Sequence, residues 1–263
     1  MFKNILLVTA ESLSKEGYDY LGLIEETLKN KKIWLNSTYL DSRRNLDTNK
    51  IKNKDLVITL GGDGTFLSVA RYLKDTPILG INFKPEYSEG YLTSIKASEI
   101  EKLSRILLGK YSVLVRQRAK AKVKGFDLET LALNEVFIGP DKSMQTATYE
   151  IEYKGKKEIQ RSSGVIVSTG SGSTGVYNSA KGKPFPSDSK NLKFIVREPK
   201  KSGSLYIPKI TQGTIGKKES LSFKSFSRHG CVIKIDAHND ESFLENTVVE
   251  VSLSDVPLNV IVL

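Results

Sequence analysis

The stretch Leu56-Val57-Ile58-Thr59-Leu60-Gly61-Gly62-Asp63-Gly64-Thr65-Phe66-Leu67 decides the fold of the N-terminal half. Its first five residues form a short apolar run, which is typical of a buried parallel strand. From Phe66 to Leu73 the apolar residues recur at helical spacing. Three glycines and an aspartate join the two segments. The stretch therefore predicts a strand, a tight glycine turn and a helix, which is the repeating unit of parallel α/β sheets.

The flanking sequence repeats this alternation of strand and helix. Apolar runs predict strands at residues 5–8, 33–35 and 77–81, and helical spacing predicts a helix at 20–28. Consecutive elements of this kind form a parallel sheet with helices on its faces. We expect a Rossmann-like α/β domain over residues 1–110.

Beyond Lys110 the helical signals almost vanish and short strand signals crowd together. Gly, Ser and Asp turns separate them, which predicts a β-sandwich-like domain over residues 111–263. The one helical exception is 173–180, after a Gly/Ser-rich loop. The apolar tail, 256–263, is expected to dock, packing back on the first domain. The predicted strands are 112–115, 120–124, 131–138, 147–153, 165–168, 192–196, 221–223, 232–235 and 247–251.

Composition limits the classes of function. The chain has 263 residues, a net charge of +10 and one cysteine, Cys231, so an internal disulfide is impossible. The positive charge is spread along the chain without a dense basic tract, which favours a lysine-rich surface over a nucleic-acid partner. No apolar run approaches the length of a membrane span, and the N-terminus lacks a signal-peptide pattern. We predict a cytoplasmic protein without a membrane partner.

The glycine turn can bind phosphate. Glycines let the backbone approach a ligand, and the free N–H groups at a helix start favour anions. Asp63 beside such a site could hold Mg²⁺ against phosphates or accept a proton from an attacking hydroxyl. The alternative is a plain tight turn in which Asp63 caps the helix. The turn is not a P-loop, because the Gly-Lys-Ser/Thr ending is missing.

Three later segments carry polar side chains that could serve a ligand. Asn82 begins a polar loop that leaves a predicted strand, where open α/β sheets bind ligands. Asn134 and Glu135 are adjacent polar residues in an apolar strand, so at least one should point inward, toward ribose hydroxyls or toward a structural network. Residues 169–174 form a Gly/Ser/Thr loop between strand and helix, suited to a nucleotide or simply flexible. His229 and His238 have no metal-ligand spacing, so no zinc site is predicted.

Taken in this order, these segments resemble the NAD kinase family. Gly-Gly-Asp-Gly-Thr-Phe-Leu at 61–67, the Asn134-Glu135 pair and Thr-Gly-Ser-Gly-Ser-Thr at 169–174 look like that family's motifs. Pro-x-x-Ser-Glu-Gly at 85–90 is closer to the mitochondrial-type branch. The resemblance covers about residues 1–240, and the joint match is more specific than any single motif.

The resemblance implies transfer of a phosphoryl group from ATP or polyphosphate to the 2′-hydroxyl of the adenosine ribose of NAD. It also implies Mg²⁺ or another divalent ion, a cleft between two domains, and a homodimer or homotetramer. Asp63 would be the base or a metal-linked carboxylate, and Gly61, Gly62, Gly64 and Thr65 would hold phosphates. No further residue is assigned to the metal, which would come with the donor phosphates. The residues expected to contact NAD are Asp63, Asn82, Asn134, Glu135, Thr169, Ser171, Gly172, Ser173, Thr174, Tyr177 and Asp236.

Three departures from the bacterial pattern concern the adenine and nicotinamide contacts. Ser163 replaces an aspartate, Gly175-Val176 replaces Ala-Tyr, and Ala237 replaces the glycine after Asp236. Two other functions stay open. A lipid kinase of the diacylglycerol or sphingosine type also uses a Gly-Gly-Asp-Gly loop, and a non-catalytic NAD-binding sensor could keep the fold without the reaction.

Overall fold

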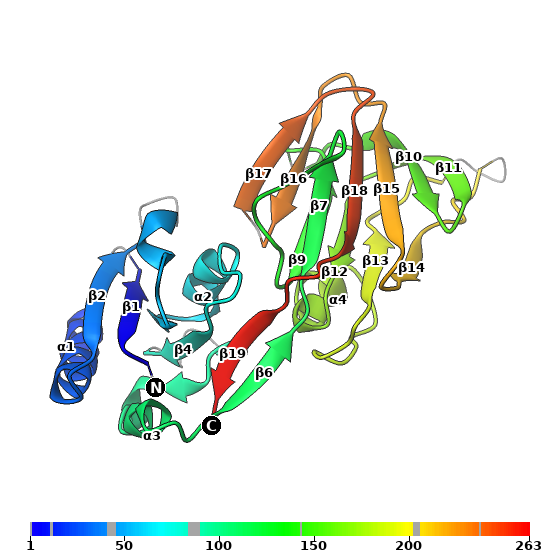
Figure 1. Cartoon of the computed structure of the whole chain (residues 1–263). Coiled ribbons are helices and arrows are strands. Elements are labelled where there is room, and N and C mark those ends of the chain that lie inside the picture. The colour runs from blue at the N-terminus through cyan, green and yellow to red at the C-terminus, as the bar shows by residue number, and fades with distance from the viewer. Residues whose placement is uncertain are drawn as a thin grey trace. The chain divides into compact units, whose positions relative to one another are not determined.

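The computed structural model describes residues 2–10, 13–40, 46–83, 90–142, 144–201, 206–236 and 238–263. The chain divides into two compact units (Figure 1). The first unit is Met1–Val115 with Leu258–Leu263, and the second is Arg116–Pro257. The division lies beyond the position after Lys110 that the change of pattern indicated, because strand β6 (Ser112–Arg116) belongs to the sheet of the first unit.

The first unit is built on a seven-stranded sheet of order β2-β1-β3-β4-β19-β6, with β5 paired to β4. Strand β1 lies between β2 and β3, β3 pairs with β4, and all of these pairs are parallel. The predicted parallel α/β class is therefore confirmed. The strands are β1 (Asn4–Thr9), β2 (Trp34–Tyr39), β3 (Leu56–Leu60), β4 (Ile78–Asn82), β5 (Ile95–Lys96) and β19 (Leu258–Val262).

Helices cover both faces of this sheet. Buried residues of α1 (Lys15–Asn30) and α3 (Lys102–Leu107) share one core with Ile5, Leu7 and Ile58. Helix α2 (Asp63–Ala70) serves the other face, where Gly80 leaves room for Phe66: a Cβ on Gly80 would lie 2.9 Å from that ring. Two 3₁₀ turns complete the unit, η1 (Thr48–Ile51) and η2 (Ala97–Glu99).

The apolar tail forms the strand β19 of the first sheet. Val260 pairs in parallel with Ile78 of β4, and Leu258, Val260 and Ile261 are buried. The tail is therefore a sheet strand rather than a loose segment.

The second unit is a sandwich of two six-stranded antiparallel sheets, as predicted. Their orders are β11-β10-β15-β18-β7-β8 and β14-β13-β12-β9-β16-β17. The inward side chains of both sheets form one apolar core. The short helical segments are η3 (Ser171–Thr174) and α4 (Val176–Ser179). The strands are β7 (Ala119–Val123), β8 (Phe126–Asp127), β9 (Glu135–Gly139), β10 (Ala147–Tyr153), β11 (Lys156–Ser162), β12 (Val165–Ser168), β13 (Leu192–Val196), β14 (Gln212–Ile215), β15 (Ser220–Ser225), β16 (Cys231–Ile235), β17 (His238–Phe243) and β18 (Val248–Leu253).

Among the described residues, no helix is both long and apolar enough to cross a membrane.

Candidate functional site

The glycine turn of the first unit lies between the end of β3 and the start of α2. The N–H of Gly61 donates to the carbonyl of Ile81 at 2.9 Å, which ties the turn to β4. A Cβ on Gly61 would lie 2.2 Å from Thr65 Oγ1, so the close packing of the turn requires glycine here. The N–H groups of Gly62 and Gly64 have no acceptor among the described residues. They stand at a helix start, where an anion would find donors and a favourable dipole.

The carboxylate of Asp63 lies in the first turn of α2, after Gly62 at the N-cap position. Its Oδ2 accepts the N–H of Tyr91 at 3.0 Å, and its Oδ1 accepts the N–H of Leu92 at 2.9 Å. These two hydrogen bonds fix the orientation of the side chain and hold the segment that returns toward β5. Asp63 is therefore not the helix cap of the alternative interpretation.

Asn82 belongs to the same corner of the first unit. It ends β4, is buried, and lies against Gly90, where an added Cβ would meet its Nδ2 at 2.6 Å. Gly90 precedes Tyr91, which donates to Asp63. The structure thus gathers residues 61–65, Asn82 and the 90–92 segment at the carboxyl ends of β3 and β4. The Pro-x-x-Ser-Glu segment, 85–89, lies outside the described residues.

Asp236 organises the corresponding corner of the second unit. Its Oδ2 accepts the N–H of Leu133 at 2.8 Å, and its Oδ1 accepts the N–H groups of Asn134 at 2.8 Å and Glu135 at 3.1 Å. Its own N–H donates to the carbonyl of Glu135 at 3.1 Å. One buried carboxylate therefore fixes the backbone of the Asn134-Glu135 pair, and charged acceptors make such hydrogen bonds strong.

Arg118 places a positive charge near Asp236 in the interior. Its side chain is fully buried and donates to the carbonyls of Val256 at 2.9 Å and Pro257 at 3.2 Å. Burial lowers the pKa of Arg118 to about 10, and the negative charge of Asp236 opposes that shift. The guanidinium therefore remains charged at neutral pH.

The strand that contains Glu135 starts later than predicted. Strand β9 begins at Glu135, so the predicted strand over 131–138 was wrong at its start. The N–H groups of residues 133–135 turn to Asp236 instead of to a neighbouring strand. Asn134 Oδ1 is buried and accepts no hydrogen bond from the described residues, which is costly unless a ligand donates to it.

The carboxyl of Glu135 is unusual in its protonation. Glu135 is 8% exposed, and burial together with the negative charge of Asp236 raises its pKa to about 8, from an ordinary value of 4.5. The group is mostly protonated at neutral pH, so it can both donate and accept a hydrogen bond. A sugar hydroxyl offers the matching donor and acceptor.

The loop at 169–174 closes on this pair. The N–H of Thr169 donates to the carbonyl of Asn134 at 2.9 Å, and its Oγ1 donates to the carbonyl of Leu133. A Cβ on Gly172 would lie 2.3 Å from the Asn134 carbonyl oxygen, so only glycine fits. Thr169, Gly172, Asn134 and Asp236, from distant parts of the chain, therefore meet in one place.

Other predicted residues of the loop are engaged inside the protein. Ser171 Oγ accepts from the buried Arg116 at 3.0 Å, and Ser173 Oγ contacts the backbone of Phe185. Thr174 is exposed. Tyr177 is buried, packs edge-to-face on Phe185 with 6.0 Å between ring centroids, and has a pKa raised by burial.

Two of the three departures fall on described residues. Ser163 Oγ donates to Glu198 Oε2, so a carboxylate lies beside this position. Gly175 is exposed, and a Cβ there would meet only the Gly172 carbonyl, at 3.5 Å. Ala237 lies outside the described residues. Within the described part of the chain, no group of three or more His, Cys, Asp or Glu side chains could hold a metal ion.

Known proteins resemble this chain along both units. Residues 5–111 match the model of the ATP-NAD kinase N-terminal domain. A probable NADH kinase of Oryza sativa subsp. japonica is 26% identical over 92% of this chain and 80% of that protein. The NAD kinase of Azotobacter vinelandii is 38% identical over 49% of this chain and 45% of its own length. The NAD kinase of Clostridium perfringens strain 13 is 37% identical over 53% of this chain and 51% of its own length. The matched stretch thus spans about half of these bacterial enzymes.

Solved structures share the fold. An NAD kinase from Archaeoglobus fulgidus in complex with ATP aligns with a TM-score of 0.76 and 21% identity, over 97% of this chain and 92% of that chain. Yeast NADH kinase complexed with NADH aligns with a TM-score of 0.81 and 16% identity, over 100% of this chain and 84% of that chain. The predicted combination of a parallel α/β unit with a β-rich unit is that of these structures.

Proposed function

We propose that this chain is a member of the NAD kinase family and that it transfers a phosphoryl group from ATP to the 2′-hydroxyl of the adenosine ribose of NAD. The observation that carries the proposal is the oriented carboxylate of Asp63, in the first turn of a helix whose start offers backbone N–H groups to phosphate. Proteins catalyse phosphoryl transfer mainly by positioning the reactants and by stabilising the charge of the transition state.

The roles of the residues follow from their chemistry. The N–H groups of Gly62 and Gly64 receive phosphate oxygens, and Asp63 accepts the proton of the attacking hydroxyl. Asn134 and Glu135 bind the ribose: the buried amide oxygen of Asn134 gains a donor, and the protonated Glu135 donates to one hydroxyl. Asp236 and Thr169 hold this pair in place through hydrogen bonds to its backbone.

The metal and the donor complete the proposal. Bound Mg²⁺ would supply neutralisation of the donor's phosphate charge, and Asp63 is the carboxylate of the glycine turn that would hold it there. Polyphosphate is the alternative donor and NADH the alternative acceptor, and both are included in the test. A homodimer or homotetramer and a cytoplasmic location stay predictions. The relatives named above are NAD or NADH kinases, which favours neither the lipid kinase nor the non-catalytic sensor.

The test is a formation assay with the purified full chain. ATP or polyphosphate is combined with NAD, NADH or diacylglycerol in the presence of Mg²⁺, and NADP(H) is measured with an NADP-specific dehydrogenase. NADP from ATP and NAD supports the proposal. Phosphorylated lipid without NADP, or NAD binding without NADP from any donor, would replace it with one of the two alternatives.

The Asp63→Asn variant tests the assigned base. We expect turnover to fall by about 10²–10⁴-fold, since a positioned general base contributes that much. Because the new amide also faces the N–H of Tyr91 or Leu92, the melting temperature is measured alongside. The matched control is Asp75→Asn, which changes an exposed aspartate of the same unit. If Asp63→Asn kept most of the activity, the role of Asp63 would be wrong.

A further inference from the structure

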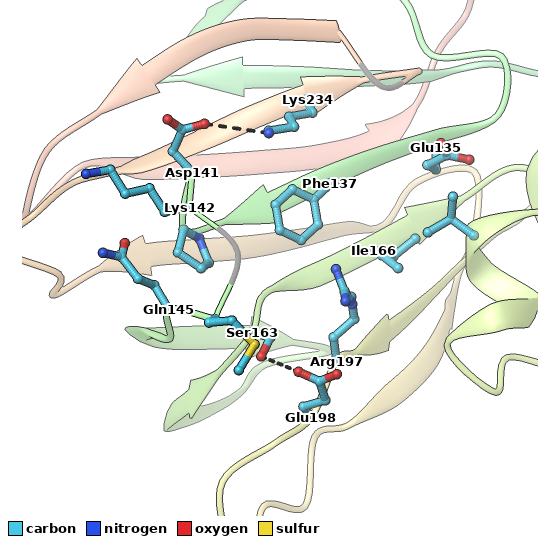
Figure 2. A pocket seen from close by; sticks show the side chains of 13 residues that line it. Glu135, Phe137, Asp141, Lys142, Gln145, Ser163, Ile166, Arg197, Glu198 and Lys234 are labelled. Atoms are coloured by element: carbon cyan, nitrogen blue, oxygen red, sulfur yellow. Dashed lines mark hydrogen bonds and ion pairs between the residues drawn. The ribbon is translucent and has the colours of Figure 1, made fainter. Parts of the chain in front are cut away.

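A pocket of about 420 Å³ opens on the second unit, beside Glu135 (Figure 2). Its floor is apolar: Phe137 of β9 and Ile166 of β12 are cross-strand partners, on the sheet face opposite the sandwich core. Glu135 lies two residues from Phe137 on β9 and so shares its face, about 7 Å away along the strand. The volume lies in the range of small-molecule sites.

Arg197 brings a positive charge to this apolar floor. Its backbone is fixed at the end of β13, since its N–H donates to the Gly164 carbonyl at 2.8 Å and its carbonyl accepts from Ser163 at 3.1 Å. Figure 2 shows its side chain reaching toward Phe137 and Ile166. The half-buried guanidinium makes no hydrogen bond or ion pair with any described residue. A planar cation over apolar surface is poorly hydrated and suited to a bidentate anion.

The neighbouring charges are mostly engaged elsewhere. Lys234 pairs with Asp141 at 3.6 Å, and Glu198 accepts from the hydroxyl of Ser163. Arg197 also lines an adjoining pocket of about 680 Å³, so a ligand that reaches the guanidinium has space beyond it. The pocket is thus lined by the Glu135 carboxyl, which the proposed function assigns to the ribose, by an apolar floor and by the Arg197 guanidinium.

We infer that Arg197 binds the diphosphate of the dinucleotide whose adenosine ribose contacts Glu135. The inference rests on the proposed function and adds a specificity residue to it. In NAD the diphosphate is joined to the adenosine ribose through a single methylene, so one pocket lined by both Glu135 and Arg197 has room for both groups. The guanidinium fork matches two phosphate oxygens, and the apolar floor strengthens the contact by excluding water.

The test compares ligands that carry or lack the diphosphate. Affinities of the full chain for NAD, ADP-ribose and adenosine are measured by isothermal titration calorimetry. Arg197→Ala should bind NAD and ADP-ribose about 10- to 100-fold more weakly, because hydrogen bonds between charged groups contribute that much, with adenosine unchanged. Arg197→Lys should fall between the two, since it keeps the charge and loses the fork.

The matched control is Arg228→Ala, which removes an exposed arginine from the β15–β16 connection of the same unit. It should bind all three ligands like the wild type. Wild-type affinity of Arg197→Ala for NAD would overturn the inference. So would an equal loss for adenosine, which would indicate a disturbed fold. These results differ from failure of the proposed function, in which the wild-type protein itself neither binds NAD nor forms NADP.

Discussion

Replacing Asp236 by asparagine tests how the second unit holds the backbone of the Asn134-Glu135 pair. Asparagine keeps the size of the side chain and can still accept the N–H groups of Asn134 and Glu135 through one oxygen. Its amide nitrogen then faces the N–H of Leu133, which is buried and loses its acceptor. The substitution therefore exchanges three hydrogen bonds to a charged acceptor for two to a neutral one.

The structure sets the size of the effect. A buried donor left without a partner costs about 1–3 kcal/mol, and each remaining bond weakens by up to about 1 kcal/mol when its acceptor becomes neutral. Arg118 also loses a nearby negative charge. We expect a loss of about 2–5 kcal/mol in the free energy of unfolding, and a KM for NAD that rises far more than the KM for ATP.

Two assays separate the local effect from a general one. Urea unfolding gives the stability, and hydrogen exchange followed by mass spectrometry gives the protection of the amides at 133–135, which should fall more than that of β10. The control Asp127→Asn removes an exposed charge from the same unit and should stay within about 0.5 kcal/mol of the wild type. A change below about 0.5 kcal/mol in the free energy of unfolding of Asp236→Asn, with protected amides and an unaltered KM for NAD, would show that the Asp236 carboxylate does not hold the Asn134-Glu135 pair.

Two further variants probe the same corner. Glu135 has a folded-state pKa raised to about 8, so its contribution to stability is lost as pH rises from about 4.5 through 8. Glu135→Gln cannot ionise, so its free energy of unfolding relative to the wild type should increase by on the order of a few kcal/mol from pH 5 to pH 9, as measured by urea titrations. A difference that does not depend on pH would contradict the raised pKa of Glu135. Gly172→Ala should push Asn134 aside and weaken NAD binding at least tenfold by calorimetry, since overpacking costs about 1–3 kcal/mol. The control Gly175→Ala, which meets nothing closer than 3.5 Å, should bind normally.

The sequence predicted those elements whose side chains follow a simple pattern. Strands β3, β10, β12 and β13 have the predicted bounds, because an apolar run or a clear alternation marks each one. Strand β11 was missed. Its sequence, Lys-Lys-Glu-Ile-Gln-Arg-Ser, is polar because β11 is an edge strand with one face in solvent.

Local sequence patterns do not show which strands pair when they are distant in the sequence. The tail was expected to dock on the first domain but not to form a strand there, and nothing in the composition of residues 112–115 says that they join the sheet of the first unit. Helix α3 was missed because its six residues are too few to show a clear helical period.

The candidate site was predicted as a set of residues but not as a set of contacts. The motifs pointed to Asn134, Glu135, Thr169 and Asp236, yet their spacing does not show that the Asp236 carboxylate holds three backbone N–H groups. Gly172 resembled part of a flexible loop, whereas it is required by its approach to Asn134. Arg197 carries no local signal at all, because its importance comes from the pocket around it.

The position of the transferred phosphate shows whether this chain phosphorylates the 2′-hydroxyl of NAD and whether Asp63 is needed for it. The full chain is incubated with NAD, ATP and Mg²⁺, and the product is examined by ³¹P NMR and tandem mass spectrometry. We expect one new phosphate, on the 2′-hydroxyl of the adenosine ribose, formed by the wild type and almost absent with Asp63→Asn. A phosphate at any other hydroxyl, or equal product from Asp63→Asn, would contradict this expectation.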